Sequence, residues 1–369
     1  MTAAGERIKA LIASQGPITI AQFMTIALLD PAGGYYATRD PFGAAGDFIT
    51  APEVSQMFGE LVGLWLAQAW IEQGRPARPL LVELGPGRGT LMADALRALK
   101  LLPLLRDSLD VVLVEASPAL KQVQQKTLAD CGVNPRWADS LDGVPSDRPL
   151  FLVANEFFDA LPIHQYVRTE RGWCERMIAR DANGALAFAP APAPYPDGNV
   201  PANRDGAPPG GVYETSPAGE ALAEEIGHRI AGHGGAALIV DYGYDAPGFG
   251  ETLQAVKSHS FAGVLDDPGA GDLSAHVDFR ALGDSAARGG ASVCGPVAQG
   301  DFLVALGIVQ RAEKLAQSHW TGGRATMPTL ADRPELMEQL DRLIKPEQMG
   351  TLFRALAIVP KNAPTPAGF

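Results

Sequence analysis

The sequence predicts a doubly wound α/β fold with a mostly parallel central sheet. Between residues 79 and 154, short apolar runs of strand length alternate with segments of helical periodicity, an order typical of strand–helix–strand units. A glycine-rich turn follows the first of these strands and leads into a helix, as in many open α/β sheets. The hydrophobic fraction of 46% over 369 residues is enough for a large core, so global disorder is excluded.

The first 75 residues predict an N-terminal helical segment that acts as a lid. Residues 4–15 have a helical apolar face, and the glycine- and aromatic-rich run 30–47 predicts an ordered surface loop. A long helix is expected from Thr50 to near Gly74, because residues 50–53 have the capping-box pattern with a proline in the first turn.

Residues 76–369 predict the α/β domain itself, with insertions at about 163–212 and 257–350. Residues 164–179 suggest a hairpin, and the proline- and glycine-rich run 190–210 suggests an irregular loop. The expected strands are 80–84, 110–115, 133–138, 150–154, 236–240, 252–256 and 353–359. The expected helices are 90–100, 118–130, 217–232, 277–288 and 300–315.

Charge and cysteine usage limit the class of protein. Lysine and arginine total 30 against 42 aspartate and glutamate, which argues against a nucleic-acid binder, because such a protein needs a basic face. No apolar run approaches the length of about 18 residues that a transmembrane helix needs, so no membrane insertion is expected. The three cysteines are too far apart for a disulfide framework, and the N-terminus resembles neither a signal nor a transit peptide. We therefore expect a cytoplasmic protein.

The glycine-rich turn has the pattern Glu83-x-Gly85-x-Gly87-x-Gly89. Its glycines permit a tight turn and a close approach of a ligand to the backbone. A dinucleotide site favours the different spacing Gly-x-Gly-x-x-Gly, and the preceding carboxylate would repel a diphosphate. The same carboxylate suits the cationic amino-acid end of S-adenosylmethionine (SAM). A tight strand–helix turn without any ligand is the remaining interpretation.

Two further acids follow the next two predicted strands. Glu115 is placed to accept hydrogen bonds from both hydroxyls of a ribose, and the alternative is a solvated strand end. Asp139 is placed to accept a hydrogen bond from an adenine amino group, and the alternative is a cap for the following helical turn. Acids at three successive strand ends together favour one ligand at this edge of the sheet.

Glu156 and Asp159 follow the fourth predicted strand. They are three residues apart, so one helical turn would place both carboxylates on one face, where they could bind a guanidinium. The alternative is an ordinary acidic first turn, stabilised by the helix dipole. Asp241, at the end of the fifth predicted strand, either lines the same edge or belongs to a turn.

Other catalytic chemistries find less support. His164, His259 and His276 are candidate acids or bases, with ordinary surface or packed histidines as the alternative. No histidine pair has the spacing of a metal site, so no metal is expected. No Ser–His–Asp or Cys–His set points to a nucleophilic enzyme.

Two longer motifs are specific. They are Gly46-Asp47-Phe48-x-Thr50-Ala51-Pro52-Glu53-x-Ser55-Gln56-x-Phe58-Gly59-Glu60 and Asn155-Glu156-Phe157-Phe158-Asp159-Ala160-Leu161-Pro162. Both resemble motifs of the MidA-type family of SAM-dependent methyltransferases, whose mitochondrial members are respiratory complex I assembly factors. Similar segments span residues 20–360. The resemblance implies a Rossmann-like class I methyltransferase fold with a seven-stranded sheet and SAM as the cofactor.

The resemblance also implies which residues hold SAM. The glycine turn and Glu115 are expected to bind it, Asp139 and Ser140 to lie near the adenine, and the segment with Asp47 and Thr50 to fold over it. The predicted cofactor set is Asp47, Thr50, Glu83, Gly85, Pro86, Gly87, Gly89, Thr90, Glu115, Ser117, Asp139, Ser140 and Asn155.

The expected activity is methyl transfer from SAM to a protein arginine. The resemblance implies symmetric dimethylation of a complex I core subunit. Glu156 and Asp159 are the expected catalytic residues, because paired carboxylates would orient the guanidinium and stabilise its charge. A SAM-binding assembly chaperone with little catalysis and a small-molecule methyltransferase stay open as alternatives. An NAD-dependent oxidoreductase is disfavoured by the spacing of the glycines.

Overall fold

The computed structural model describes residues 2–38, 50–195, 206–246, 248–257, 260–318 and 328–369. The chain divides into two compact units. The first unit comprises residues 1–48, 159–222 and 246–278, and the second comprises residues 49–158, 223–245 and 279–369. The predicted segment 1–75 and the predicted insertion 257–350 are therefore each divided between the two units.

The second unit is built on one large sheet. The strands along its main path are β2 (Leu80–Leu84), β3 (Asp110–Val114), β4 (Arg136–Ala138), β5 (Leu150–Asn155), β10 (Gly235–Tyr244), β15 (Ser292–Ala298) and β16 (Phe353–Val359). They lie in the order β15-β16-β10-β5-β2-β3-β4. Strands β4, β3, β2, β5 and β10 pair in parallel, whereas β16 runs antiparallel to β10 and β15. The prediction of a mostly parallel α/β sheet is confirmed.

The strand order reverses between β2 and β5. Strand β2 pairs with β3 on one side and with β5 on the other, so the chain builds the sheet outward in opposite directions. Ligands of open α/β sheets bind at such a switch point, outside the carboxyl ends of the strands. Glu83 and Asn155 lie at these strand ends, and Glu115 directly follows β3.

Two strands differ from the sequence predictions. The predicted strand 252–256 belongs to a small sheet of the first unit, as β11 (Gln254–Lys257). Strand β15 is not among the expected strands, because its Gly295 and Pro296 are residue types that strands disfavour. The register shift between Cys294 and Val297 accommodates them at the edge of the sheet.

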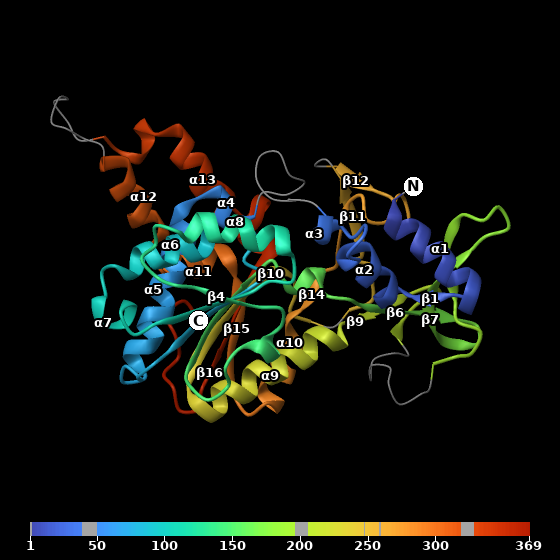
Figure 1. Cartoon of the computed structure of the whole chain (residues 1–369), viewed down its shortest axis with the longest axis horizontal. Helices are drawn as coiled ribbons and strands as arrows, with labels where there is room; N and C mark the ends of the chain where they lie inside the picture. Colours follow the sequence, from blue (N-terminus) through green and yellow to red (C-terminus); the bar gives the residue numbers. More distant parts are fainter. Residues whose placement is uncertain (1, 39–49, 196–205, 247, 258–259, 319–327) are drawn as a thin grey trace. The chain divides into compact units, whose positions relative to one another are not determined.

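Helices cover both faces of the large sheet. The helices of this unit, together with α9, which begins in the first unit, are α4 (Ala51–Val54), α5 (Gln56–Glu72), α6 (Thr90–Leu99), α7 (Pro103–Arg106), α8 (Pro118–Leu128), α9 (Pro217–His233), α10 (Phe279–Arg288), α11 (Gln299–Ala305), α12 (Ile308–Gln317) and α13 (Pro334–Ile344). In Figure 1, α5 and α6 lie on one side of the sheet, and α9 and α10 lie on the other. This arrangement is the doubly wound one that the sequence predicts.

The single helix expected from Thr50 to near Gly74 is wrong, because two helices meet at Ser55. Ser55 has extended backbone angles (φ −160°, ψ 138°), and its hydroxyl accepts a hydrogen bond from the backbone N–H of Met57, at 3.4 Å. Ser55 is therefore the N-cap of α5. Thr50 occupies the N-cap position of α4, but its side chain makes no capping hydrogen bond.

Helices α5 and α6 pack unusually closely, because two glycines face the contact. A Cβ added to Gly59 would lie 2.7 Å from the Cβ of Asp94, and one added to Gly63 would lie 2.7 Å from the Cα of Ala95. Such distances leave no room for a methyl group. Gly63 therefore lets the two backbones approach each other directly.

The first unit combines helices with two small sheets. Its elements include α1 (Ala3–Gln15), β1 (Ile18–Thr19), α2 (Ile20–Leu29), α3 (Tyr35–Thr38), β6 (His164–Thr169), β7 (Gly172–Arg180), β8 (Leu186–Pro190), β9 (Val212–Thr215), β12 (Ser260–Ala262) and β13 (Asp272–Ser274). Strands β6 and β7 form the antiparallel hairpin predicted at 164–179. Within the described ranges, no helix of the chain is both long enough and apolar enough to cross a bilayer.

Candidate functional site

The glycine turn between β2 and α6 requires its glycines. Gly85, Gly87 and Gly89 have φ values of +62°, +51° and +83°, in the left-handed region that side chains with a Cβ disfavour. A Cβ on Gly85 would also lie 2.6 Å from the ring of Phe157. The turn therefore presents bare backbone, against which a ligand can lie closely.

Glu83 holds a buried carboxyl at the end of β2. The residue is only 3% exposed, and burial raises its pKa from 4.5 to about 8. The backbone N–H of Met92 lowers the pKa by a hydrogen bond, and the negative charge of Glu115 raises it. Among the described residues, Oε2 of Glu83 has no hydrogen-bond partner. Burying such an acceptor is costly, so a cationic ligand that donates hydrogen bonds would fit here.

Asn155 provides a second buried acceptor at the end of β5. Its Nδ2 donates to Oε1 of Glu156, at 3.2 Å, whereas its Oδ1 is buried and has no hydrogen-bond partner in the described part of the chain. The register pairs Glu83 with Val153, and side chains alternate along a strand, so Glu83 and Asn155 lie on the same face of the sheet. An ammonium group has three N–H donors and can use both acceptors.

Glu115, just after β3, has a carboxylate that is held at both oxygens. Oε1 accepts a hydrogen bond from the backbone N–H of Ser117, at 2.8 Å, and Oε2 accepts one from Nε2 of Gln124, at 3.0 Å. Burial raises the pKa of Glu115, and these two donors, the Lys121 ammonium and the backbone N–H of Ala116 oppose the rise. The alternative interpretation of Glu115 as a solvated strand end is therefore wrong, because the residue is only 9% exposed. The Ser117 hydroxyl itself caps α8 by accepting from the N–H of Leu120.

Gln124 is a buried residue that the sequence analysis does not identify. Its Nε2 also donates to the carbonyl oxygen of Gly87, at 2.8 Å, and its Oε1 accepts from Nε1 of Trp137, at 2.8 Å. One side chain thus contacts the glycine turn, Glu115 and β4. The signal in the sequence is a glutamine at the centre of the spacing Leu120–Gln124–Leu128, which is one buried face of α8.

Asp139 and Ser140 follow β4. The carboxylate of Asp139 is 84% exposed and lies 2.5 Å from Nζ of Lys121. The N-cap of the next helical turn, Leu141–Gly143, is Ser140. The interpretation of Asp139 as the cap of that turn is therefore wrong, because the carboxylate forms an ion pair instead.

Glu156 and Asp159 do not share a helical turn. Asn155 ends β5, Glu156 has a left-handed φ of +50°, and the next helical turn is a 3₁₀ turn over Phe158–Ala160. The left-handed residue interrupts the helical path, so the prediction that one turn aligns both carboxylates is wrong. Oε1 of Glu156 accepts a hydrogen bond from the backbone N–H of Ala51, at 2.9 Å, which attaches the start of α4 to the end of β5.

Asp241 shapes the turn after β5. It is fully buried, and its Oδ2 accepts hydrogen bonds from the backbone N–H groups of Phe157, at 3.1 Å, and Phe158, at 2.9 Å. Its Oδ1 accepts from the N–H of Tyr242, at 2.9 Å. Asp241 therefore positions the segment that carries Glu156, a role that the sequence analysis does not predict.

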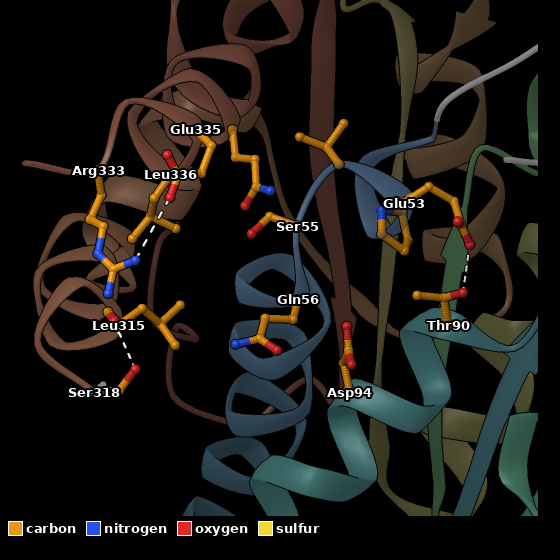
Figure 2. Close-up of a pocket in the computed structure, with 13 residues that line it drawn as sticks. Glu53, Ser55, Gln56, Thr90, Asp94, Leu315, Ser318, Arg333, Glu335 and Leu336 are labelled. Atoms are coloured by element: carbon orange, nitrogen blue, oxygen red, sulfur yellow. Dashed lines mark hydrogen bonds and ion pairs between the residues drawn. The ribbon is translucent and has the colours of Figure 1, made fainter. Parts of the chain in front are cut away.

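Thr90 borders a cavity of about 450 Å³ (Figure 2). The wall is formed by the start of α4 and α5, by α6, and by the C-terminal helices: Pro52, Glu53, Val54, Ser55, Gln56, Thr90, Asp94, Leu315, Ser318, Arg333, Glu335, Leu336 and Gln339. Figure 2 shows the Thr90 hydroxyl directed at Glu53, whose carboxylate accepts its hydrogen bond at 2.5 Å. Because Thr90 directly follows Gly89, this bond connects α4 to the glycine turn.

The other candidates are distributed more widely. Asp47 and His259 lie outside the described residues. Nδ1 of His164 lies 2.6 Å from the carboxylate of Glu175, and burial lowers the pKa of His276. Among residues with assigned positions, no group of three histidine, cysteine or acidic side chains could hold a metal ion.

Comparisons with known proteins identify the family. The model of a family described as "Putative S-adenosyl-L-methionine-dependent methyltransferase" matches residues 61–297. The chain is 37% identical to protein arginine methyltransferase NDUFAF7, mitochondrial, of Danio rerio, with 94% of this chain and 85% of that protein covered. The Homo sapiens protein of the same name is 36% identical, with 95% and 81% covered. A crystal structure of a Burkholderia thailandensis protein bound to S-adenosyl-homocysteine is 28% identical, with a TM-score of 0.81 and with 99% of this chain and 94% of that chain covered.

These matches confirm some expectations and correct one. The predicted resemblance, the methyltransferase activity and SAM as the cofactor are confirmed. The expectation of a cytoplasmic protein is wrong, because the curated relatives, which match about 95% of the chain, are named as mitochondrial. The chain belongs to the MidA-type family of SAM-dependent methyltransferases.

Proposed function

We propose that the protein transfers a methyl group from SAM to a nitrogen of a protein arginine. The binding of SAM is supported by one pair of buried hydrogen-bond acceptors, Glu83 Oε2 and Asn155 Oδ1. They lie at the ends of two adjacent strands, β2 and β5, at the switch point of the sheet. The choice of a protein arginine as the methyl acceptor is supported by the name of the curated relatives, protein arginine methyltransferase.

The cofactor site follows from the strand ends. Glu83 and Asn155 accept hydrogen bonds from the ammonium group of SAM, and the glycine turn, with Pro86 and Thr90, lies against its amino-acid end. Glu115, held by the N–H of Ser117, accepts hydrogen bonds from the ribose hydroxyls. Asp139 and Ser140 lie beside the adenine, and Thr50, at the start of α4, lies over the cofactor.

Bound SAM supplies a methyl group that its sulfonium already activates. The protein therefore mainly provides alignment, proximity and exclusion of water. We propose that the carboxylate of Glu156 contacts the guanidinium of the acceptor arginine. The pKa of an arginine exceeds about 12, so a neutral nitrogen is scarce, and a carboxylate beside the guanidinium stabilises the charge as the methyl arrives. Asp159, three residues further along the chain, is the second proposed carboxylate.

Replacement of Glu156 by glutamine tests this assignment. The new amide keeps an oxygen that can accept the N–H of Ala51, so the fold of α4 is preserved while the charge is lost. We expect Glu156→Gln and Asp159→Asn to lose at least about 100-fold in methyl transfer to protein arginine, as a removed charge-stabilising group does, with S-adenosylhomocysteine (SAH) affinity within about twofold of wild type. Incorporation of labelled methyl groups measures the first quantity and calorimetry the second.

The matched control is Glu170→Gln, which changes an exposed glutamate of the β6–β7 hairpin and should leave both quantities unchanged. Unchanged turnover in Glu156→Gln would remove the residue from the mechanism. Labelled products that contain methylated small molecules but no methylarginine would instead favour a small-molecule methyltransferase.

We further propose that the protein substrate is a core subunit of respiratory complex I and that its arginine is dimethylated symmetrically. This proposal follows from the family resemblance. Mass spectrometry of complex I subunits from a deletion strain, with and without the Glu156→Gln variant, tests it. Loss of the methylarginine in the deletion strain is expected, and full complex I assembly supported by the transfer-deficient variant would favour a chaperone role instead.

A further inference from the structure

We propose that Gln124 is a positioning residue of the SAM site, which fixes the ribose-binding carboxylate of Glu115 and the backbone of the glycine turn relative to each other. The inference rests on the proposed role of Glu115. Gln124 belongs to none of the motifs that suggest the cofactor site, and it lies on α8 rather than at a strand end.

The orientation of the Gln124 amide follows from its neighbours. The indole Nε1–H of Trp137 can only donate a hydrogen bond, so the amide atom that faces it, at 2.8 Å, is the oxygen. The amide nitrogen therefore faces the Gly87 carbonyl, at 2.8 Å, and Oε2 of Glu115, at 3.0 Å. Both N–H groups and the oxygen of a fully buried side chain are thus used, and the flipped amide would place two acceptors against its oxygen.

These contacts explain how a buried acid can bind a neutral diol. Each carboxylate oxygen has two acceptor positions, and Glu115 uses one of them on each oxygen for Ser117 and Gln124. The backbone N–H of Ala116 also interacts with the carboxylate. The carboxylate plane is therefore fixed, and its remaining acceptor capacity can serve hydroxyl donors. The Gly87 contact holds the centre of the glycine turn, where φ is +51°. A single side chain thereby sets the spacing between two walls of the proposed site.

Two substitutions separate the effects of lost hydrogen bonds and of added charge. Gln124→Met keeps the length and removes all three hydrogen bonds. Gln124→Glu keeps the acceptor for Trp137 but turns a carboxylate oxygen toward Glu115 and the Gly87 carbonyl. Because a hydrogen bond to a charged group contributes more than a neutral one, we expect SAH affinity to fall about tenfold in Gln124→Met and at least about 100-fold in Gln124→Glu.

Calorimetric titration of the full-length protein with SAH measures these affinities. The matched control is Gln125→Met, the same change at the next residue of α8, which is exposed and should bind SAH as wild type does. For turnover, we expect the KM for SAM to rise in Gln124→Met while kcat at saturating SAM stays within about twofold of wild type, because Gln124 acts on binding and not on the transferred methyl group.

A merely structural role of Gln124 predicts a different pattern. It would lower the thermal midpoint of the ligand-free protein but leave the SAH affinity of the folded fraction unchanged. A double-mutant cycle separates the two roles: if Gln124 acts partly through Glu115, the Gln124→Met/Glu115→Ala double variant loses less affinity than the sum of the two single losses.

Three outcomes of these measurements test the proposed role of Gln124. SAH affinity of Gln124→Met within about twofold of wild type, or additive losses in the cycle, would overturn the inference about Gln124. Unchanged affinity in Glu115→Ala would instead remove Glu115 from the proposed site, which is a failure of the proposed function itself. Weakening by Gln124→Met together with non-additivity supports both.

Discussion

The carboxyl of Glu83 makes a quantitative prediction about cofactor binding. Burial raises its pKa to about 8, so at pH 7 the ligand-free protein carries about 0.9 proton at this group. An ammonium beside Oε2 favours the charged carboxylate and so lowers the pKa of Glu83. Binding of SAH at pH 7 should therefore release about 0.4 to 0.9 proton per molecule bound.

Titration calorimetry in buffers of different ionisation enthalpy measures this release. We expect Glu83→Gln to abolish it and to weaken binding, since the amide does not titrate and carries no charge. Glu313→Gln, an exposed position on α12, is the matched control and should release as many protons as wild type. Wild-type binding without proton release, or an equal release by Glu83→Gln, would refute the reasoning.

The same shift determines how the stability of the ligand-free protein depends on pH. The unfolded chain loses the Glu83 proton above its ordinary pKa of 4.5, whereas the folded protein retains it to about pH 8. The contribution of Glu83 to the free energy of unfolding is therefore lost as the pH rises between these values, by about 5 kcal/mol in total. In urea titrations, Glu83→Gln should lose less stability than wild type over this interval. A parallel loss in both proteins would contradict the shift.

Three further substitutions test the backbone around the site. Gly85→Ala places a Cβ 2.6 Å from the Phe157 ring, at a residue whose φ is +62°. Calorimetry should therefore show that SAH affinity falls at least about tenfold. Binding close to that of wild type would contradict the close contact. Gly63→Ala places a methyl group 2.7 Å from the Cα of Ala95 and should lower the free energy of unfolding by about 1–3 kcal/mol, measured in urea. An unchanged urea midpoint would contradict this prediction. Asp241→Asn removes one carboxylate acceptor from a buried site with three backbone donors, so we expect a similar loss of stability and slower methyl transfer; an unaffected melting temperature would show that the turn does not need the charge.

Much of the large sheet could be predicted from local sequence. Runs such as 80–84 and 150–154 are apolar throughout, apart from Glu83, as expected for parallel strands covered on both faces, and they become β2 and β5. Strand β15 escapes this reasoning, because the hydrogen bonds to β16 compensate for an unfavourable Gly295-Pro296 pair. Pairing partners that lie far along the chain leave no local signal.

The strand-end acids could be located from the sequence, whereas their surroundings could not. Glu83 and Glu115 stand at strand ends, which a linear pattern reveals. The left-handed backbone of Glu156 depends on Asp241, which lies 85 residues further along the chain. The Asp241 carboxylate accepts hydrogen bonds from the N–H groups of the two residues after Glu156, Phe157 and Phe158. Glutamate rarely adopts such a conformation, so the sequence favours an ordinary helical turn there.

Gln124 shows the opposite case, in which a local signal exists but is easily overlooked. A polar residue between Leu120 and Leu128 on one helical face is equally consistent with an imperfect apolar stripe. Its meaning depends on three partners, Gly87, Glu115 and Trp137, which come from three other elements. Only the folded chain brings these groups together.

A crystal structure of this protein with SAH would show whether the strand ends of the large sheet bind the cofactor. We expect the amino group of the ligand to lie within hydrogen-bonding distance of Glu83 Oε2 and Asn155 Oδ1, and its ribose hydroxyls to contact the Glu115 carboxylate that Gln124 holds. A ligand bound away from the turn 85–89, or one whose amino group contacts neither buried acceptor, would contradict the proposed cofactor site.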